Sequence, residues 1–305
     1  MAEGPETPLD PHGVDDIRAR IDALDQQIQA LISERAVLAQ AMGGSKRSEP
    51  EGPRDFYRPE REAQVLRGVL ERNEGPLRDE EMVRLFREIM SACLAQQEPL
   101  KVAFLGPEGT FTQAAVLKHF GHSVRALSLA TIDEVFHEVE SGVADFGVVP
   151  VENSTEGVVS NTLDMLISSN LKICGEVELR IRQHLMGRMA SLEDIRRIYS
   201  HQQSLAQCRT WIEQKLGDVE CRTVSSNAEA ARRARDEEGA AAIAGDTAAE
   251  IYGLRLMMTN IEDKPDNTTR FLVIGRDIFP PSGNDKTSLL MSGRHQAGAL
   301  QELLY

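Results

Sequence analysis

One basic residue lies in an otherwise apolar helical seam near the N-terminus. Arg35 occupies a seam position, and burying a guanidinium costs free energy unless an anion meets it there. A side chain that reaches past the seam to water, a salt bridge to another subunit, or an anionic ligand would each satisfy this charge. The seam residues alternate at spacings of four and three, as in a long amphipathic helix: Ile17, Ile21, Leu24, Ile28, Leu31, Arg35, Leu38 and Met42.

Further polar side chains accompany Arg35 in the first hundred residues. They are Arg18, Lys46, Arg61, Glu62 and Gln97, and Gln97 takes the next position of an apolar stripe that ends at Leu94. Arg18 and Arg35 are 17 positions apart, which places them about 100° apart around a helix. One helix therefore cannot aim both at one pocket, whereas an antiparallel dimer could bring them to two shared pockets.

Four polar motifs in the second part of the chain fall at strand ends or helix starts, where α/β folds bind ligands. GPEGTFT follows a strand and opens a helix, as an anion-binding turn does, but lacks the GK[ST] of a nucleotide-binding P-loop. None of the motifs contains a Ser-His-Asp set or a metal-ligand cluster, so hydrolysis and metal catalysis fit poorly. The motifs are GPEGTFT (106–112), PVENSTEGVV (150–159), SHQQSLAQC (200–208) and DNTTRFLVI (266–274).

The elements that carry these residues divide into an all-helical unit and an α/β unit. We expect residues 1–13 to be disordered and helices over 14–42, from about Pro59, and over 79–97, with the first ended by Gly43-Gly44. So long a first helix cannot bury its seam within one chain, which predicts pairing with a second subunit.

From residue 101 the pattern alternates between strands and helices, which predicts an α/β domain of two lobes with mainly parallel sheets. A linker is expected at 280–283 and another strand at 286–292. The expected strands are 101–105, 146–151, 171–177, 197–200, 220–224, 240–244, 254–258 and 270–274, and the expected helices are 131–141, 156–168, 203–216, 226–237 and 245–252.

Composition narrows the classes of function. The chain has 305 residues and a formal net charge of −14, which argues against non-specific nucleic-acid binding. Apolar runs are too short for a membrane span, and the acidic, Pro-rich start does not resemble a signal peptide. The four cysteines are scattered, with no CxxC pair and no nearby His cluster. We interpret them as reduced thiols of a cytoplasmic protein without a metal site.

The helical unit, residues 14–98, resembles the all-helical chorismate mutases in residues 17–42, Lys46, RPERE (58–62) and the stretch 86–97. The resemblance implies an intertwined three-helix dimer that rearranges chorismate without a cofactor, by holding a flexible diacid and aiming donors at the ether oxygen. It also implies roles for individual residues: Arg35 holds a carboxylate, Arg18 reaches in from the partner chain, Lys46 and Gln97 bond the ether oxygen, Glu62 meets the ring hydroxyl, Arg61 orders the pocket, and Arg58 stands where many relatives carry an acid.

Residues 101–278 resemble the prephenate dehydratases, most tellingly in the triplet Thr269-Arg270-Phe271. The resemblance implies two lobes like those of periplasmic binding proteins, with prephenate in the cleft between them, losing carbon dioxide and water. Thr269 would be the proton donor, assisted by the field of Arg270. The cleft would be lined by Thr110, Asn153, Ser154, Ser200, His201 and Gln203, and Phe271 would pack beside it.

The last residues, 285–305, resemble the incomplete start of an ACT domain, a regulatory module that binds phenylalanine. We expect a phenylalanine site only in a complete module, since one strand cannot bury its own face.

Together these resemblances predict a bifunctional enzyme of phenylalanine synthesis that takes chorismate and prephenate as substrates. Two alternatives stay open: a dehydratase whose helical unit serves only as a dimerisation arm, and a non-catalytic two-lobed binding protein.

Overall fold

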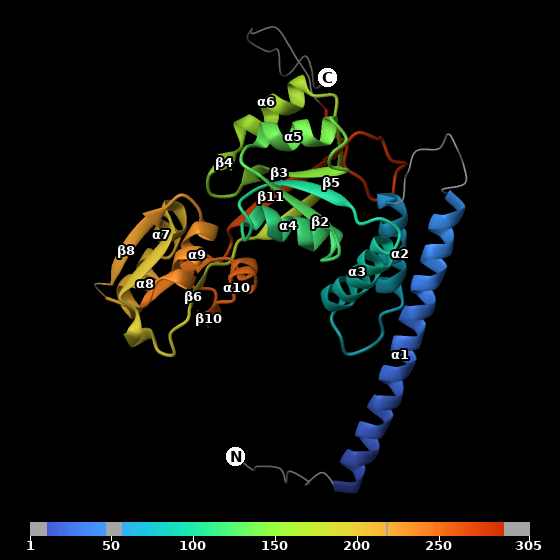
Figure 1. Ribbon diagram of the computed structural model, residues 1–305, viewed down its shortest axis with the longest axis horizontal. Coiled ribbons are helices and arrows are strands. Elements are labelled where there is room, and N and C mark those ends of the chain that lie inside the picture. The colour runs from blue at the N-terminus through green and yellow to red at the C-terminus, as the bar shows by residue number, and fades with distance from the viewer. Residues whose placement is uncertain (1–10, 47–56, 218, 290–305) are drawn as a thin grey trace, which may run out of the picture.

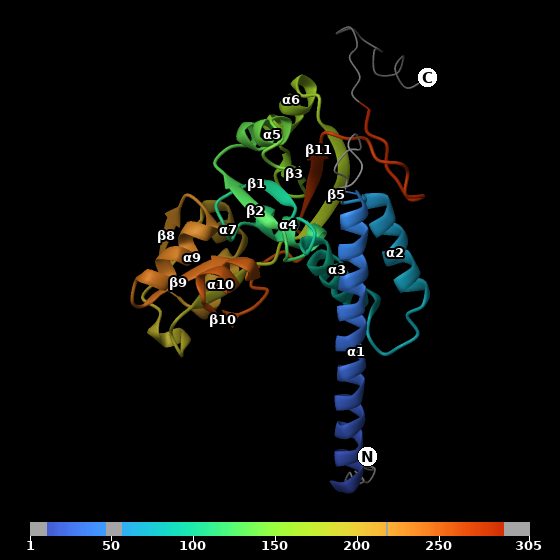
Figure 2. The same cartoon turned by 45° about the vertical axis from the view of Figure 1, so that its right-hand side comes forward.

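The computed structural model describes residues 11–46, 57–217 and 219–289, with only the backbone at 11–12 and 43–46. The helical unit consists of α1 (Pro11–Lys46), α2 (Pro59–Glu71) and α3 (Asp79–Ala95). Pro59 occupies the first turn of α2, where its missing N–H costs no helical hydrogen bond. α1 packs on α3 near its C-terminal end, and its N-terminal half extends well beyond the rest of the unit (Figures 1 and 2).

Two expectations about α1 are wrong. The helix already begins at Pro11, inside the segment expected to be disordered, and it continues through Gly43-Gly44 to Lys46. Glycine costs a helix about 1 kcal/mol relative to alanine, which weakens a helix without ending it. Residues 1–10 lie outside the described part of the chain.

The α/β unit has two lobes, as predicted. The first is built on a six-stranded sheet of order β2-β1-β3-β11-β5, with β4 paired to β3. Helix α4 (Phe111–Phe120) covers one face, and α5 (Ile132–Glu140) and α6 (Ser160–Ser168) cover the other (Figure 1). The strands are β1 (Lys101–Leu105), β2 (Arg125–Leu129), β3 (Phe146–Asn153), β4 (Gly157–Val158), β5 (Lys172–Arg180) and β11 (Thr268–Gly275).

The second lobe is built on a five-stranded sheet of order β10-β6-β9-β7-β8. Its core is rich in alanine, because β9 and α9 approach each other closely and contribute Ala231, Ala240 and Ala242, all fully buried. The elements are β6 (His184–Gly187), β7 (Arg197–His201), β8 (Glu220–Val224), β9 (Ala240–Ala244), β10 (Arg255–Met258), α7 (Gln202–Gln207), α8 (Arg209–Lys215), α9 (Asn227–Asp236) and α10 (Asp246–Tyr252), with a short 3-10 turn at Leu192–Asp194.

The expectation of mainly parallel sheets is wrong. Among the described strands, four pairings are parallel and five are antiparallel. The chain returns from the second lobe to insert β11 between β3 and β5, antiparallel to both. The chain thus crosses between the lobes twice, once after β5 and once before β11. Two backbone hydrogen bonds join these crossing segments: Ile181 N–H donates to Asn267 O over 2.8 Å, and Ile261 N–H donates to Gln183 O over 2.9 Å.

The helical unit and the first lobe share one core. Tyr57, just before α2, places its ring among those of the first lobe, with centroids 5.5 Å from Phe120 and 5.4 Å from Phe146. The segment after β11 also returns to this junction, where Phe279 packs on Phe146 and the Ser282 carbonyl accepts a hydrogen bond from Arg67 of α2. The two units are therefore packed together.

The strand expected at 286–292 is absent from the described chain, because residues 286–289 form no regular structure. Residues 290–305, with the remainder of the ACT-like stretch, lie outside the described part. No helix in the described ranges is long and apolar enough to cross a membrane.

Candidate functional site

A cavity of about 320 Å³ lies at the junction of the helical unit and the first lobe. Four arginines face it against one glutamate, so it favours an anionic ligand. Among the residues singled out from the sequence, the structure brings together Arg35, Arg58, Arg61, Glu62 and Gln97, and it adds Arg87.

The polar side chains of this cavity are held by specific bonds. Gln97 Nε2 donates to Ala39 O over 2.7 Å and so ties the end of α3 to α1. Arg58, the residue before α2, bonds Glu60 over 2.7 Å. Arg61 NH1 donates to Gln64 Oε1 over 3.3 Å. These bonds hold polar groups on a largely apolar scaffold, as a preorganised site requires.

Among the described residues, Glu62 is the only carboxylate that lines this cavity. It accepts a hydrogen bond from Arg87 Nε over 3.3 Å, and Tyr57 lines the cavity with it. Burial raises the pKa of the Glu62 carboxyl, and the Arg87 charge, the Tyr57 hydroxyl and the Arg87 hydrogen bond oppose that rise. Arg87 and Tyr57 therefore both favour the ionised form of this carboxyl.

One predicted residue, Arg18, does not face this cavity. Arg18 lies far along α1, is paired with Asp15 over 3.2 Å, and has a side chain that is 72% exposed. Lys46 ends α1, and its side chain lies outside the described part of the structure.

Sequence reasoning missed Arg87. It stands three, four and seven positions before Met90, Ser91 and Leu94, which also line the cavity. That helical spacing was the available signal, but Arg87 lies beside the apolar stripe rather than within it.

A second cavity of about 320 Å³ lies between the two lobes. Thr110 and Phe271 come from the first lobe, and His201 and Gln203 from the start of α7 in the second. The turn before α4 and the turn before α7 therefore face each other across it. The predicted residues that line this cavity are Thr110, Asn153, His201, Gln203, Thr269 and Phe271.

A β-bulge brings Asn153 to this cavity. The register of β3 against β11 pairs Glu152 with Arg270 and Pro150 with Phe271, so Val151 is the extra residue. One extra residue reverses which side the following side chains take. Asn153 therefore lies on the same side as its partner Thr269, while Glu152 and Arg270 face the other side.

The amide of Asn153 has a defined orientation. Its Oδ1 accepts from the backbone N–H groups of Thr155 and Glu156, over 2.9 and 3.1 Å. Its Nδ2 therefore makes the donated bonds to Thr269 Oγ1 over 2.8 Å and to Asn267 Oδ1 over 2.9 Å. Because the Thr269 oxygen accepts this bond, its own proton remains available for another acceptor.

Three predicted residues do not line the interlobe cavity. Ser200 is fully buried and donates to Ile243 O over 2.7 Å, so it supports β7. Ser154 accepts from Thr268 N–H over 3.0 Å. Arg270 lies on the opposite side of the sheet, paired with Glu152 over 3.5 Å, so its charge is largely compensated there.

Several cavity residues were not singled out from the sequence. Ser204, Gln207 and Asn267 stand inside the motifs SHQQSLAQC and DNTTRFLVI, so their motifs pointed to them. Gln183 and Asn227 lie outside any motif. Asn227 accepts from His201 N–H over 3.1 Å and donates to Ser204 Oγ over 2.9 Å, and so holds the start of α7.

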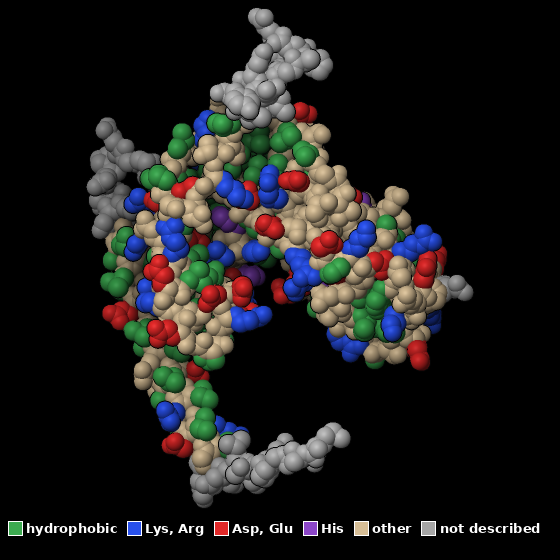
Figure 3. All heavy atoms as spheres, turned by 180° about the vertical axis from the view of Figure 1, so that it is seen from behind, with side chains coloured by type: hydrophobic (Ala, Val, Ile, Leu, Met, Phe, Trp, Pro, Cys, Tyr) green, Lys and Arg blue, Asp and Glu red, His purple; other side chains and the backbone are tan. Residues whose placement is uncertain are grey.

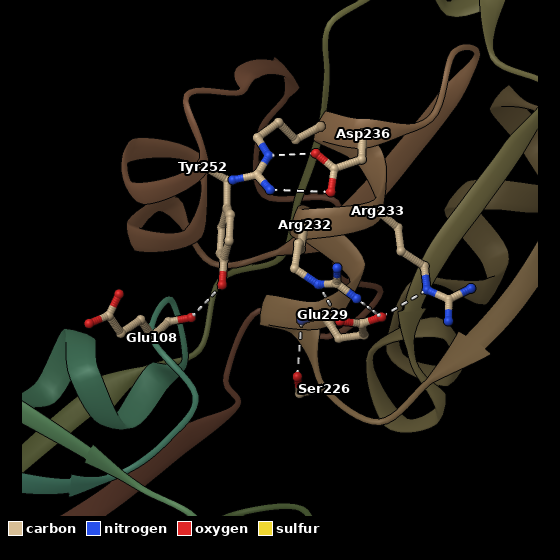
Figure 4. A network of polar contacts seen from close by, with 8 residues as sticks. Glu108, Ser226, Glu229, Arg232, Arg233, Asp236 and Tyr252 are labelled. Carbon is tan, nitrogen blue, oxygen red and sulfur yellow. Dashed lines mark hydrogen bonds and ion pairs between the residues drawn. The ribbon is translucent and has the colours of Figure 1, made fainter.

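The two lobes also meet directly beside this cavity. The Tyr252 hydroxyl of α10 donates to the Glu108 carbonyl of the first lobe over 3.1 Å, in the turn that carries Thr110 (Figure 4). A Cβ at Gly109 would lie 3.0 Å from the Tyr252 ring and 3.3 Å from Ala248 Cα. Gly109, at φ +87°, thus permits both the turn and this close approach.

No group of three or more His, Cys, Asp or Glu side chains suited to holding a metal occurs within the described ranges. Among the described residues, the polar side chains of the two cavities carry amides, hydroxyls, guanidinium groups, one thiol, one imidazole and one carboxylate. Such groups can hold carboxylates and donate hydrogen bonds to oxygen atoms that gain charge.

Comparison with known proteins agrees with this division. The family model described as chorismate mutase type II matches residues 17–98, and that described as prephenate dehydratase matches residues 102–278. A protein of Stutzerimonas stutzeri named bifunctional chorismate mutase/prephenate dehydratase is 57% identical over 291 residues, which cover 94% of this chain and 80% of the relative.

Solved structures resemble the α/β unit. Prephenate dehydratase from Arthrobacter aurescens, in complex with L-Phe, is 32% identical with a TM-score of 0.59, over 67% of this chain and 71% of that one. GqqA, titled a novel type of quorum quenching acylase, is 27% identical with a TM-score of 0.56, over 67% of this chain and 75% of that one. One fold thus carries more than one named activity, and the matches along the whole chain decide between them. The chain belongs to the family of bifunctional chorismate mutase/prephenate dehydratases.

Proposed function

We propose that the cavity of the helical unit converts chorismate into prephenate and that the interlobe cavity converts prephenate into phenylpyruvate. The observation that carries this proposal is the separation of the motif residues into two cavities. Arg35, Arg61 and Gln97 face the first, and Asn153 and Thr269 face the second.

In the first cavity the reaction needs no nucleophile, because the rearrangement is a single intramolecular step. Arg35 holds a carboxylate of chorismate, and Gln97 and Lys46 donate to the ether oxygen as its bond breaks. Glu62 accepts a hydrogen bond from the ring hydroxyl. Gln97 is neutral, so its contribution does not change as the pH changes.

In the second cavity Thr269 donates a hydrogen bond to the departing ring hydroxyl of prephenate. The hydroxyl leaves as water with one added proton, carbon dioxide leaves from the ring carboxylate, and the electrons of the broken C–C bond complete the aromatic ring. The bond from Asn153 to Thr269 Oγ1 supports this role, because it directs the Thr269 proton elsewhere.

We propose further that α1 pairs with α1 of a second chain and that Arg18 enters the partner's cavity. Ile21, Leu24, Ile28 and Leu31 are each more than half exposed in the single chain, and apolar side chains follow the outer length of α1 (Figure 3). The four unpaired cysteines fit a cytoplasmic location.

Two variants, each assayed on chorismate and on prephenate, test the assignment of the cavities. We expect Arg35→Ala to lower chorismate turnover about 100-fold or more and to leave prephenate turnover within about twofold. Thr269→Ala should do the reverse. If either folded variant lost both activities, the two-cavity assignment would be wrong. If the wild-type chain did not turn over chorismate, the helical unit would be a dimerisation arm only.

A further inference from the structure

The cavity of the helical unit is not enclosed by helices of that unit alone. Phe120 ends α4 of the dehydratase domain, and Ser123 and Val124 follow it, and all three line the cavity. The dehydratase domain therefore forms one wall of a cavity whose charged residues come from α1, α2 and α3.

Arg87 joins the two domains at this wall. Its Nε donates to Glu62 Oε1 over 3.3 Å, and its NH1 donates to Lys118 O over 3.0 Å. Lys118 lies in the last turn of α4, whose carbonyl groups lack helical partners and attract a cation. The Arg87 side chain is 23% exposed and that of Glu62 is 17% exposed, so solvent screens this pair only partly.

Tyr57 also acts on Glu62. Its ring packs against Phe120 and Phe146 of the dehydratase domain, and it lines the cavity with Glu62, whose pKa its hydroxyl lowers. Burial, and then the nearby Glu62 charge, raises the Tyr57 pKa well above its usual value. The hydroxyl therefore stays protonated and remains a donor.

Tyr57 and Arg87, which both act on Glu62, are thus both anchored in the dehydratase domain. We infer that Tyr57 and Arg87 are positioning residues that orient Glu62, so that the dehydratase domain completes the chorismate site of the same chain. The inference rests on the proposed function of the helical cavity. Its chemical content is that Tyr57 and Arg87 orient the Glu62 carboxylate so that it accepts a hydrogen bond from the ring hydroxyl of chorismate.

Three variants of the full chain test this inference. Tyr57→Phe keeps the ring in the core and removes only the hydroxyl, and Arg87→Gln removes the charge. The matched control is Arg84→Gln, on the same helix, where Arg84 is exposed and pairs with Glu81 over 2.6 Å without lining either cavity. Turnover of chorismate and of prephenate is measured across a range of pH, with the melting temperature of each variant.

We expect Tyr57→Phe and Arg87→Gln each to lower kcat/KM for chorismate by about tenfold or more, with prephenate turnover within about twofold. Both partners lower the Glu62 pKa, so the loss of either should move the acid limb of the chorismate profile to higher pH. Among the described residues that line the cavity, the charged or titratable groups around Glu62 are those of Arg35, Tyr57, Arg58, Arg61, Arg87 and Cys93. Glu62→Gln should lower turnover and remove this limb.

The inference is wrong if Tyr57→Phe and Arg87→Gln keep the chorismate turnover and pH profile of Arg84→Gln. It is also wrong if their losses extend equally to prephenate and follow the melting temperature, because that pattern indicates a purely structural role. Neither result touches the assignment of the cavities, which depends on wild-type chorismate turnover and on Arg35→Ala.

Discussion

Asn153 and Thr269 lie opposite each other on neighbouring antiparallel strands, and Asn153 Nδ2 donates to Thr269 Oγ1 over 2.8 Å. A one-residue bulge at Val151 makes this pair possible, since regular pairing would turn Asn153 to the other side of the sheet. The position and orientation of the Thr269 hydroxyl, which we propose as the proton donor, therefore depend on the Asn153 amide and on the bulge in β3.

The substitution Asn153→Asp tests this relationship. A carboxylate still accepts hydrogen bonds from the N–H groups of Thr155 and Glu156, so the turn should persist. Its second oxygen, however, also accepts a hydrogen bond from the Thr269 hydroxyl. We expect prephenate turnover to fall about 100-fold or more and chorismate turnover to stay within about twofold. Asn161→Asp on α6, which lines neither cavity, is the control. Equal prephenate turnover in both variants would show that Asn153 has no role in the mechanism.

Tyr252→Phe tests the contact between the lobes. It removes the bond to Glu108 O that holds the turn carrying Thr110 against α10, so the cleft should close less readily. We expect KM for prephenate to rise about threefold to tenfold, with a smaller change in kcat. Tyr199→Phe is the control, because its hydroxyl bonds Glu237 within the second lobe. A KM equal to that of the control would show that the bond does not govern closure.

Ile28→Glu tests the proposed dimer. Ile28 is 53% exposed in the apolar seam, and a charge placed there would be buried on pairing at a cost of several kcal/mol. Sedimentation velocity should show a monomer, with loss of chorismate turnover because the partner's Arg18 is absent. Gln29→Glu, one position off the seam, should sediment like the wild type. A dimeric Ile28→Glu would place the interface elsewhere.

Stability should depend on pH through His119. Burial, with a smaller contribution from the Arg87 charge, lowers the His119 pKa to about 4. An unfolded histidine titrates near its ordinary value, so between that value and pH 4 the unfolded chain binds more protons and stability falls as the pH falls. Relative to His119→Gln, the wild type should lose about 1–2 kcal/mol of unfolding free energy between pH 7 and pH 5. Urea titrations at the two pH values measure this, and parallel losses in both proteins would contradict it.

Local signals in the sequence anticipated most elements. β1, β8 and β9 have the bounds expected from their apolar runs. β2 was missed because it is an edge strand of mixed exposure, and β6 because its residues carry no alternating pattern. The predicted end of α1 at Gly43-Gly44 was wrong, since the helix continues to Lys46. Local composition does not show whether a helix continues past glycine.

The sequence by itself determined the two units, their order, and the motifs that carry the chemistry, because helical and strand periodicity and short motifs are local properties of the chain. Only the tertiary structure decided which polar residues meet. The β3 bulge and the insertion of β11 bring Asn153 to Thr269 and turn Arg270 away. The packing of α3 against α2 brings Arg87 to Glu62, and its packing against α4 brings Arg87 to Lys118. These are contacts between residues distant in sequence, so they depend on register and packing rather than on any local pattern.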